Sequence, residues 1–264
     1  MGVFIRREDS TNGLMPHEYL ECVLVSLVGL APISVIQNYM YKKIMIELRK
    51  LTNPEKIKIL SIFFKTGKGQ YAEGDKMLCV SVPEQREIAK KYYKLSNLKD
   101  VDKLLASPYH EDRLTGLIIL TYQMDASTSL SARKNIVKFY LKHLDRVNNW
   151  DLVDLSCYKI LGNYLLTHSR GVLYKLARTN HLWSQRVAIV STYAFIRQGQ
   201  FTDTIKLAKI FLHHKHDLIH KAVGWMLREV GKRDEKVLRS FLDKYANKMP
   251  RVMFRYAVER IGYR

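Results

Sequence analysis

The sequence has little cysteine, and its cysteines follow no structural or metal-binding pattern. Cys22, Cys79 and Cys157 are odd in number and widely spaced, and no two of them form a C-x-x-C pair. This pattern argues against a disulfide framework. It indicates reduced thiols and predicts a cytoplasmic protein.

The sequence also lacks a recognisable export or membrane signal. Residues 1–9 do not show the basic-then-apolar order of a secretory signal, and Arg6 stands where a myristoylation motif needs serine or threonine. The most apolar run, residues 22–36, contains Gly29 and Pro32 and is shorter than the roughly 20 residues that span a bilayer. We expect a buried helix and turn there and no stable membrane association, with a peripheral membrane contact as the alternative.

Strict alternation of apolar and polar residues is scarce, which argues against β-strands. Apolar residues instead recur at spacings of three and four, as in Leu114, Leu117, Ile118 and Tyr122. Turn-forming residues interrupt these stretches at short intervals, so the pattern predicts an all-α protein with helices of about 10 to 18 residues joined by short loops. We expect a helical extension over residues 1–36, with a helix at residues 17–30, and one helical domain over residues 37–264.

Acidic residues are too few to balance the basic ones. The chain has 44 Lys and Arg against 25 Asp and Glu, a net charge of +19, while its 47% hydrophobic content is sufficient for a large core. This imbalance favours a polyanionic partner, with nucleic acid first and an anionic membrane surface second. A surplus that merely keeps the protein soluble is the remaining alternative.

A weak internal repeat runs from residue 113 to residue 255 of the chain. A charged residue followed by small or apolar residues recurs at separations of roughly 32 to 41 residues, the period of HEAT-like helical repeats. This period predicts a right-handed superhelical solenoid of antiparallel helix pairs with a concave basic groove, and four of the five charges would form a cationic ladder along it. The alternative is a set of unrelated cations near helix starts. The five positions are Arg113, Asp154, Arg186, Lys221 and Arg255.

A basic, glycine-containing loop follows Phe63 and Phe64. Its sequence, Lys-Thr-Gly-Lys-Gly, does not have the G-x-x-x-x-G-K-[ST] spacing of a phosphate-binding loop, so a nucleotide hydrolase is disfavoured. Lys65 and Lys68 are candidates for contacts with a DNA backbone, and a solvated turn explains the same residues equally well.

Asp154 is the candidate catalytic group, because it is the one acid in the row of cations. Trp150 lies four residues before it and Trp225 four residues after Lys221, so each tryptophan shares a helical face with a ladder position. Trp183 fits a core position better. The arrangement predicts two indole rings flanking one carboxylate, although tryptophans at helical apolar positions are more often core residues.

A carboxylate among cations suits the stabilisation of positive charge better than proton donation, because neighbouring cations favour its ionised form. Cleavage of a glycosidic bond through an oxocarbenium-like transition state fits this role. An alkylated purine already carries positive charge and leaves without a general acid, so one carboxylate suffices. Indole faces would add cation–π attraction of about 0.5 to 2 kcal/mol each.

Three motifs of residues 40–264 resemble the DNA alkylation repair (AlkD-like) glycosylases: W-D-x-V-D at 150–154, L-W-x-Q-R at 182–186 and K-A-x-G-W-x-L-R-E at 221–229. The segment 71–83 is similar to that family's amino-terminal signature. The resemblance implies excision of N3- and N7-alkylated purines from duplex DNA without metal or cofactor. It implies that Asp154 is the catalytic carboxylate, that Trp150 and Trp225 contact the lesion, and that Arg186 and Arg228 hold the backbone.

The sequence departs from the family pattern at Cys79 and Ser81, where glycine and arginine are usual, and in residues 1–36. His216 and His220 share a helical face, yet no third protein ligand accompanies them, so no metal site is expected. We expect a monomeric, metal-independent DNA-alkylpurine glycosylase. The rival interpretations are a non-catalytic HEAT-like DNA-binding protein and a scaffold that binds an acidic peptide.

Overall fold

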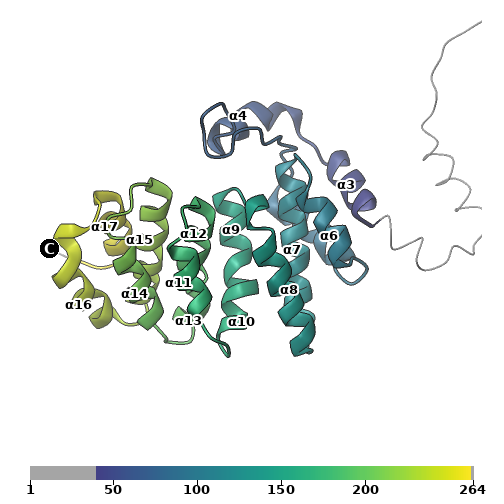
Figure 1. The fold of residues 1–264 in the computed structure, drawn as a ribbon. Coiled ribbons are helices and arrows are strands. Elements are labelled where there is room, and N and C mark those ends of the chain that lie inside the picture. Colours follow the sequence, from purple (N-terminus) through teal and green to yellow (C-terminus); the bar gives the residue numbers. More distant parts are fainter. Residues whose placement is uncertain (1–39, 263–264) are drawn as a thin grey trace, which may run out of the picture. The chain divides into compact units, whose positions relative to one another are not determined.

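The structure is a computed structural model that describes residues 40–262. Within this range the regular elements are helices, and an isolated parallel bridge joins Lys76 and Tyr109 (Figure 1). The prediction of an all-α protein is therefore confirmed. The extension predicted for residues 1–36, including the helix at 17–30 and the apolar run at 22–36, lies outside the described residues.

The described chain begins with α3 (Met40–Lys50), a 3-10 turn η1 (Pro54–Lys56) and α4 (Ile57–Phe63), and a long loop then leads to α5 (Val82–Tyr92). The helices that follow are α6 (Leu98–Leu105), α7 (His110–Ala126), α8 (Leu130–Lys142), α9 (Trp150–Cys157), α10 (Asn163–Leu165), α11 (Gly171–Ala177), α12 (Leu182–Val190), α13 (Tyr193–Ile196), α14 (Thr202–Ile210), α15 (Asp217–Gly231), α16 (Glu235–Tyr245) and α17 (Arg251–Val258). Short turns η2 (Leu144–Arg146), η3 (Tyr158–Gly162) and η4 (Ala246–Lys248) connect some of them.

From α7 onward the helices stack side by side (Figure 1). One row consists of α7, α9, α12, α15 and α17, and each of these helices packs against the next. On the other side α11 packs on α12, and α14 and α16 pack on α15. This arrangement is that of a helical repeat protein. The right-handed superhelix and its concave basic groove stay predictions.

Glycine allows close contact between helices of the row. A Cβ atom at Gly224 would lie 2.5 Å from the main-chain oxygen of Met253, and one at Gly162 would lie 2.5 Å from that of Ser191. The helices approach this closely because neither glycine has a side chain. Gly224 follows Lys221 by three residues, so one of the small residues after a repeat charge allows this close approach.

The helix that carries the candidate catalytic acid has a defined start and an irregular third turn. Asn149 is fully buried, and its side-chain oxygen accepts a hydrogen bond of 2.8 Å from the Trp150 N–H, which caps α9. After α9 the chain passes through the π-helical turn η3 before it enters α10. Asp154 thus lies one turn inside a capped helix and one turn before a π-bulge, a feature often found beside functional sites.

Candidate functional site

Asp154 and Arg186 form a bidentate ion pair between α9 and α12. The Arg186 Nε donates to Asp154 Oδ1 at 2.9 Å, and its Nη2 donates to Oδ2 at 2.7 Å. Arg186 Nη1 also donates to the carbonyl oxygen of Leu218 at 2.5 Å, which connects the pair to the start of α15. The fork geometry fixes the orientation of the carboxylate plane.

The ion pair is largely removed from solvent. The side chains of Arg186 and Asp154 are 6% and 15% exposed, respectively. Burial raises the pKa of the Asp154 carboxyl, and the charge and hydrogen bonds of Arg186 oppose this rise. The sequence had predicted that neighbouring cations favour the ionised form; the structure adds a desolvation effect of opposite sign.

Trp150 lies in an aromatic cluster at the start of α9. The ring of Phe64 stacks on Trp150 with 5.5 Å between centroids, and Phe63 meets Trp150 edge-on at 5.9 Å. Phe64 also lies 4.9 Å from the His110 ring at the start of α7. Trp150 is half-buried, so part of its surface stays open to solvent on the helix that carries Asp154.

A second aromatic group begins one turn after Asp154. Tyr158 contacts Tyr193 edge-on at 5.3 Å, and Tyr193 lies 6.0 Å from Trp225 of α15. All three are half-buried. Trp225 is therefore linked to the helix of Asp154 through two tyrosines, and aromatic side chains lie both one turn before and one turn after the carboxylate. Trp183, in contrast, is buried at 4% exposure, which confirms its predicted core position.

Beneath the first aromatic group, His110 connects two carboxylates. Its Nε2 lies 2.7 Å from Asp151 Oδ2, and its Nδ1 lies 3.6 Å from Asp75 Oδ2. Burial lowers the pKa of His110, but the charge and hydrogen bond of Asp151, the Asp75 carboxylate 3.6 Å away and the charge of Glu111 together raise it to about 9. A protonated His110 therefore fastens α7 and the loop at Asp75 to the first turn of α9.

The cationic ladder differs from its prediction at Arg113. This side chain is 5% exposed, and its Nη2 donates to Asp75 Oδ2 at 2.5 Å and to the Asn148 side-chain oxygen at 3.1 Å. Arg186 is likewise buried against Asp154. Because these guanidinium groups face carboxylates inside the fold, the row is not the open set of cations that the sequence suggested, and repeat spacing alone does not reveal such internal pairing.

The remaining predicted cations are more accessible. Lys65, Lys68 and Arg255 are exposed, whereas Lys221 is half-buried and pairs with Asp217 at 2.7 Å in the preceding turn. Arg228 is 19% exposed and pairs with Glu259 of the turn after α17. In this structure Arg228 therefore contacts its own fold.

Neither the histidine-rich segment nor the cysteines form a metal site in the described part of the chain. Among residues 40–262, no three His, Cys, Asp or Glu side chains gather closely enough to hold a metal ion. The His220 Nε2–H donates to the carbonyl oxygen of His214, and His216 caps α15. Cys79 and Cys157 are free, as predicted, and both are buried, while Cys22 lies outside the described residues.

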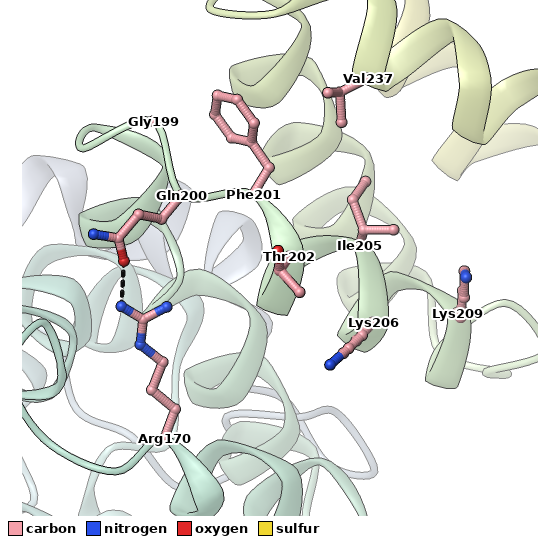
Figure 2. Close-up of a pocket in the computed structure, with 9 residues that line it drawn as sticks. All are labelled: Arg170, Gly199, Gln200, Phe201, Thr202, Ile205, Lys206, Lys209 and Val237. Carbon is pink, nitrogen blue, oxygen red and sulfur yellow. Dashed lines mark hydrogen bonds between the residues drawn. The ribbon is translucent and has the colours of Figure 1, made fainter.

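A basic hollow of about 630 Å³ lies at α14 and α16 and does not include the candidate site. Figure 2 shows Arg170 bonded to Gln200, and Phe201 and Ile205 with Val237 along one side. None of the predicted site residues lines it. The candidate site is instead centred on Asp154 of α9, with Trp150 one turn earlier on the same helix and Trp225 on α15.

Three aromatic residues near Trp150 escaped the sequence-based assignment of site residues. Phe63 and Phe64 contact Trp150 directly, and Tyr71 lies edge-on to Trp183 at 5.7 Å. Their apolar run and the basic loop carried no repeat signal. Of the three, only Tyr71 lies inside the amino-terminal signature segment, residues 71–83, and that position could have identified it as a site residue.

No helix among the described residues is both long enough and apolar enough to cross a membrane. A comparison with curated protein sequences finds no match. Among solved structures, the chain is similar to a predicted DNA alkylation repair enzyme from Enterococcus faecalis, with a TM-score of 0.62 and 15% sequence identity over 81% of this chain and 98% of that one. This likeness shows the same fold. The family model of the DNA alkylation repair enzymes matches residues 44–261, and the chain therefore belongs to the DNA alkylation repair enzyme family.

Proposed function

We propose that this protein is a DNA glycosylase that hydrolyses the bond between deoxyribose and an N3- or N7-alkylated purine in duplex DNA. The observation that carries the proposal is the Asp154 carboxylate, fixed in orientation by Arg186 with aromatic groups one turn before and one turn after it. Membership in the repair family supplies DNA as the substrate.

The proposed reaction needs one negative group. The alkylated base carries a positive charge, so the bond between C1′ and the base nitrogen breaks as the electron pair moves onto the base, which leaves neutral. Positive charge then develops on the sugar, where Asp154 stabilises it and orients a water molecule toward C1′. The water oxygen bonds to C1′, and its proton passes to solvent. No metal and no cofactor is required.

The other residues have supporting roles in this proposal. Trp150 and Trp225 present aromatic faces to the cationic nucleotide. Lys221, Arg255, Lys65 and Lys68 contact phosphates. Arg186 acts as a positioning residue, and Arg113 and Arg228, whose charges face Asp75 and Glu259, stabilise the walls of the site.

One observation favours the rival in which the protein binds DNA without turnover. Both oxygens of Asp154 already accept hydrogen bonds from Arg186, which reduces the negative charge that the carboxylate offers to a substrate. A binding protein would retain the same cations and aromatic groups.

Release of free base distinguishes a glycosylase from a protein that only binds DNA. Duplex DNA with one 7-methylguanine is incubated with the wild type, with Asp154→Asn and with Asp243→Asn, an exposed acid on α16, as the control. We expect the wild type and the control to release 7-methylguanine and Asp154→Asn to be slower by at least about 100-fold, the size of effect typical of a lost electrostatic group. Equal release by all three, or no release by any, contradicts the enzymatic proposal.

A further inference from the structure

Helix α4 is apolar, yet it adds nothing to the core. Apart from Lys58 and Ser61, every residue of Ile57–Phe63 is apolar, and none is buried. Ile59, Ile62 and Phe63 are 68%, 62% and 57% exposed. Their spacing of three and four places them on one face of the helix. Contiguous exposed apolar side chains of this size mark a contact surface.

This face is held in a fixed position beside the candidate site. Phe63 and Phe64 pack on Trp150, so the end of α4 is attached to the first turn of the helix that carries Asp154. Before α4, the Asn53 N–H donates to the carbonyl oxygen of Leu78 at 3.0 Å. After α4, the returning segment is bound by the Glu111 carboxylate, which accepts from the N–H groups of residues 78 and 79 at 2.8 and 2.7 Å.

Unpaired positive charge surrounds the apolar face. Lys56, Lys58, Lys65 and Lys68 are exposed, and no carboxylate of residues 40–262 lies within ion-pair distance of any of them. The surface thus combines apolar side chains at its centre with cations at its edge. A protein partner would need a strongly acidic rim to match it, whereas duplex DNA offers phosphates on both sides of stacked bases.

We propose that Ile59 and Ile62 form a wedge that enters the minor groove of duplex DNA and partly unstacks one base step close to the nucleotide that faces Asp154. Proteins that kink DNA insert isoleucine, leucine or phenylalanine between bases in this way, and cations hold the adjacent phosphates. The wedge would move the neighbouring nucleotide out of the regular stack and toward the carboxylate. This inference rests on duplex DNA as the substrate of the proposed function, and not on base excision.

The test uses undamaged duplexes, so it is independent of glycosylase activity. In a first set of duplexes, 2-aminopurine is placed at one position after another, because its fluorescence rises when it unstacks. A second duplex carries a donor and an acceptor dye at its ends, and energy transfer between them reports bending. The proteins are the full-length wild type, the double variant Ile59→Ser/Ile62→Ser, and Leu130→Ser. Leu130 is 69% exposed at the start of α8 and serves as a control for the loss of an exposed apolar side chain.

We expect the wild type and Leu130→Ser to brighten 2-aminopurine and to bring the dyes closer. The double variant is expected to lose most of both signals and to bind about tenfold more weakly, which corresponds to about 1.4 kcal/mol. Its binding should keep the same dependence on salt, because the lysines are unchanged. Circular dichroism and urea unfolding are expected to be unaltered, since neither isoleucine is buried.

Two results overturn the inference. In the first, the double variant unstacks and bends DNA as the wild type does. In the second, the double variant retains full DNA binding but no longer binds vesicles of phosphatidylcholine with 30 mol% phosphatidylserine that the wild type binds, which assigns the face to a membrane. Loss of the wedge signals together with unchanged 7-methylguanine release, or the reverse, separates the fate of this inference from that of the proposed function.

Discussion

Replacing Arg186 by methionine tests whether the Asp154–Arg186 pair behaves as a buried unit. The substitution keeps an unbranched side chain of similar length but leaves the Asp154 carboxylate without its partner and the Leu218 carbonyl without a donor. Breaking a buried pair on one side costs about 3 to 5 kcal/mol. The side chains are 6% and 15% exposed, so we expect a value near the lower limit, about 3 kcal/mol.

Urea unfolding at 25 °C of Arg186→Met, Asp154→Asn and the double variant measures this cost as a free energy. Asp154→Asn removes the uncompensated charge, so the double variant is expected to regain about 1 to 2 kcal/mol relative to Arg186→Met. The control is Arg239→Met, because Arg239 pairs with Glu235 on the surface with 43% and 49% exposure and its loss should cost at most about 0.5 kcal/mol.

The dependence on pH gives a second readout of the same variant. Burial raises the pKa of Asp154, and Arg186 opposes this, so the pKa rises further when Arg186 is lost. A carboxyl whose pKa is higher in the folded state than in the unfolded state makes folding less favourable as it ionises. Arg186→Met should therefore recover stability as the pH falls from 7 toward 4. A loss below about 1 kcal/mol, or additivity in the double variant, would refute the picture of a buried coupled pair.

Three further outcomes follow from the geometry. The pKa of His110 is raised from 6.5 to about 9, so protonated His110 stabilises the fold fully below pH 6.5, and this stabilisation is lost as the pH rises through 9. Urea unfolding should show a loss of up to about 3 kcal/mol over that interval, and a His110→Gln variant should show a smaller loss. Gly224→Ala should cost about 1 to 3 kcal/mol in the same assay, because the new Cβ would lie 2.5 Å from a main-chain oxygen of α17, whereas Gly171→Ala, whose Cβ would make an ordinary 3.7 Å contact, should not destabilise the fold in this way. Lys221→Gln and Arg255→Gln should each reduce the log–log salt slope of binding to undamaged duplex by about 0.9, and an unchanged slope would remove these residues from the phosphate contacts.

The fold was predictable from the sequence because helical periodicity and a repeat spacing are local properties. Leu114, Leu117 and Ile118 are buried on α7 as their spacing predicts, and Gly224 lies where two helices make close contact. These features depend on residues three, four or about thirty-five positions apart, and they survive without knowledge of tertiary contacts.

The electrostatic surroundings of the site were not predictable in the same way. Arg113 is paired with Asp75, which precedes it by 38 residues in a loop without repeat character, and Phe64 reaches Trp150 across 86 residues. The partner of a charged side chain depends on how loops fold back on the helices, and the spacing of residues in the sequence does not show this. The repeat pattern predicted where charges occur but not which of them form ion pairs inside the fold.

The central claim is that one carboxylate acts on a base that already carries positive charge. Single-turnover release from otherwise identical duplexes tests it, with cationic 7-methylguanine in one and neutral hypoxanthine in the other, for the wild type and for Asp154→Asn. The account predicts release of 7-methylguanine alone and a strong reduction in the variant. Comparable release of hypoxanthine, whose departure needs a proton donor, or release of 7-methylguanine that is the same in both proteins, would contradict it.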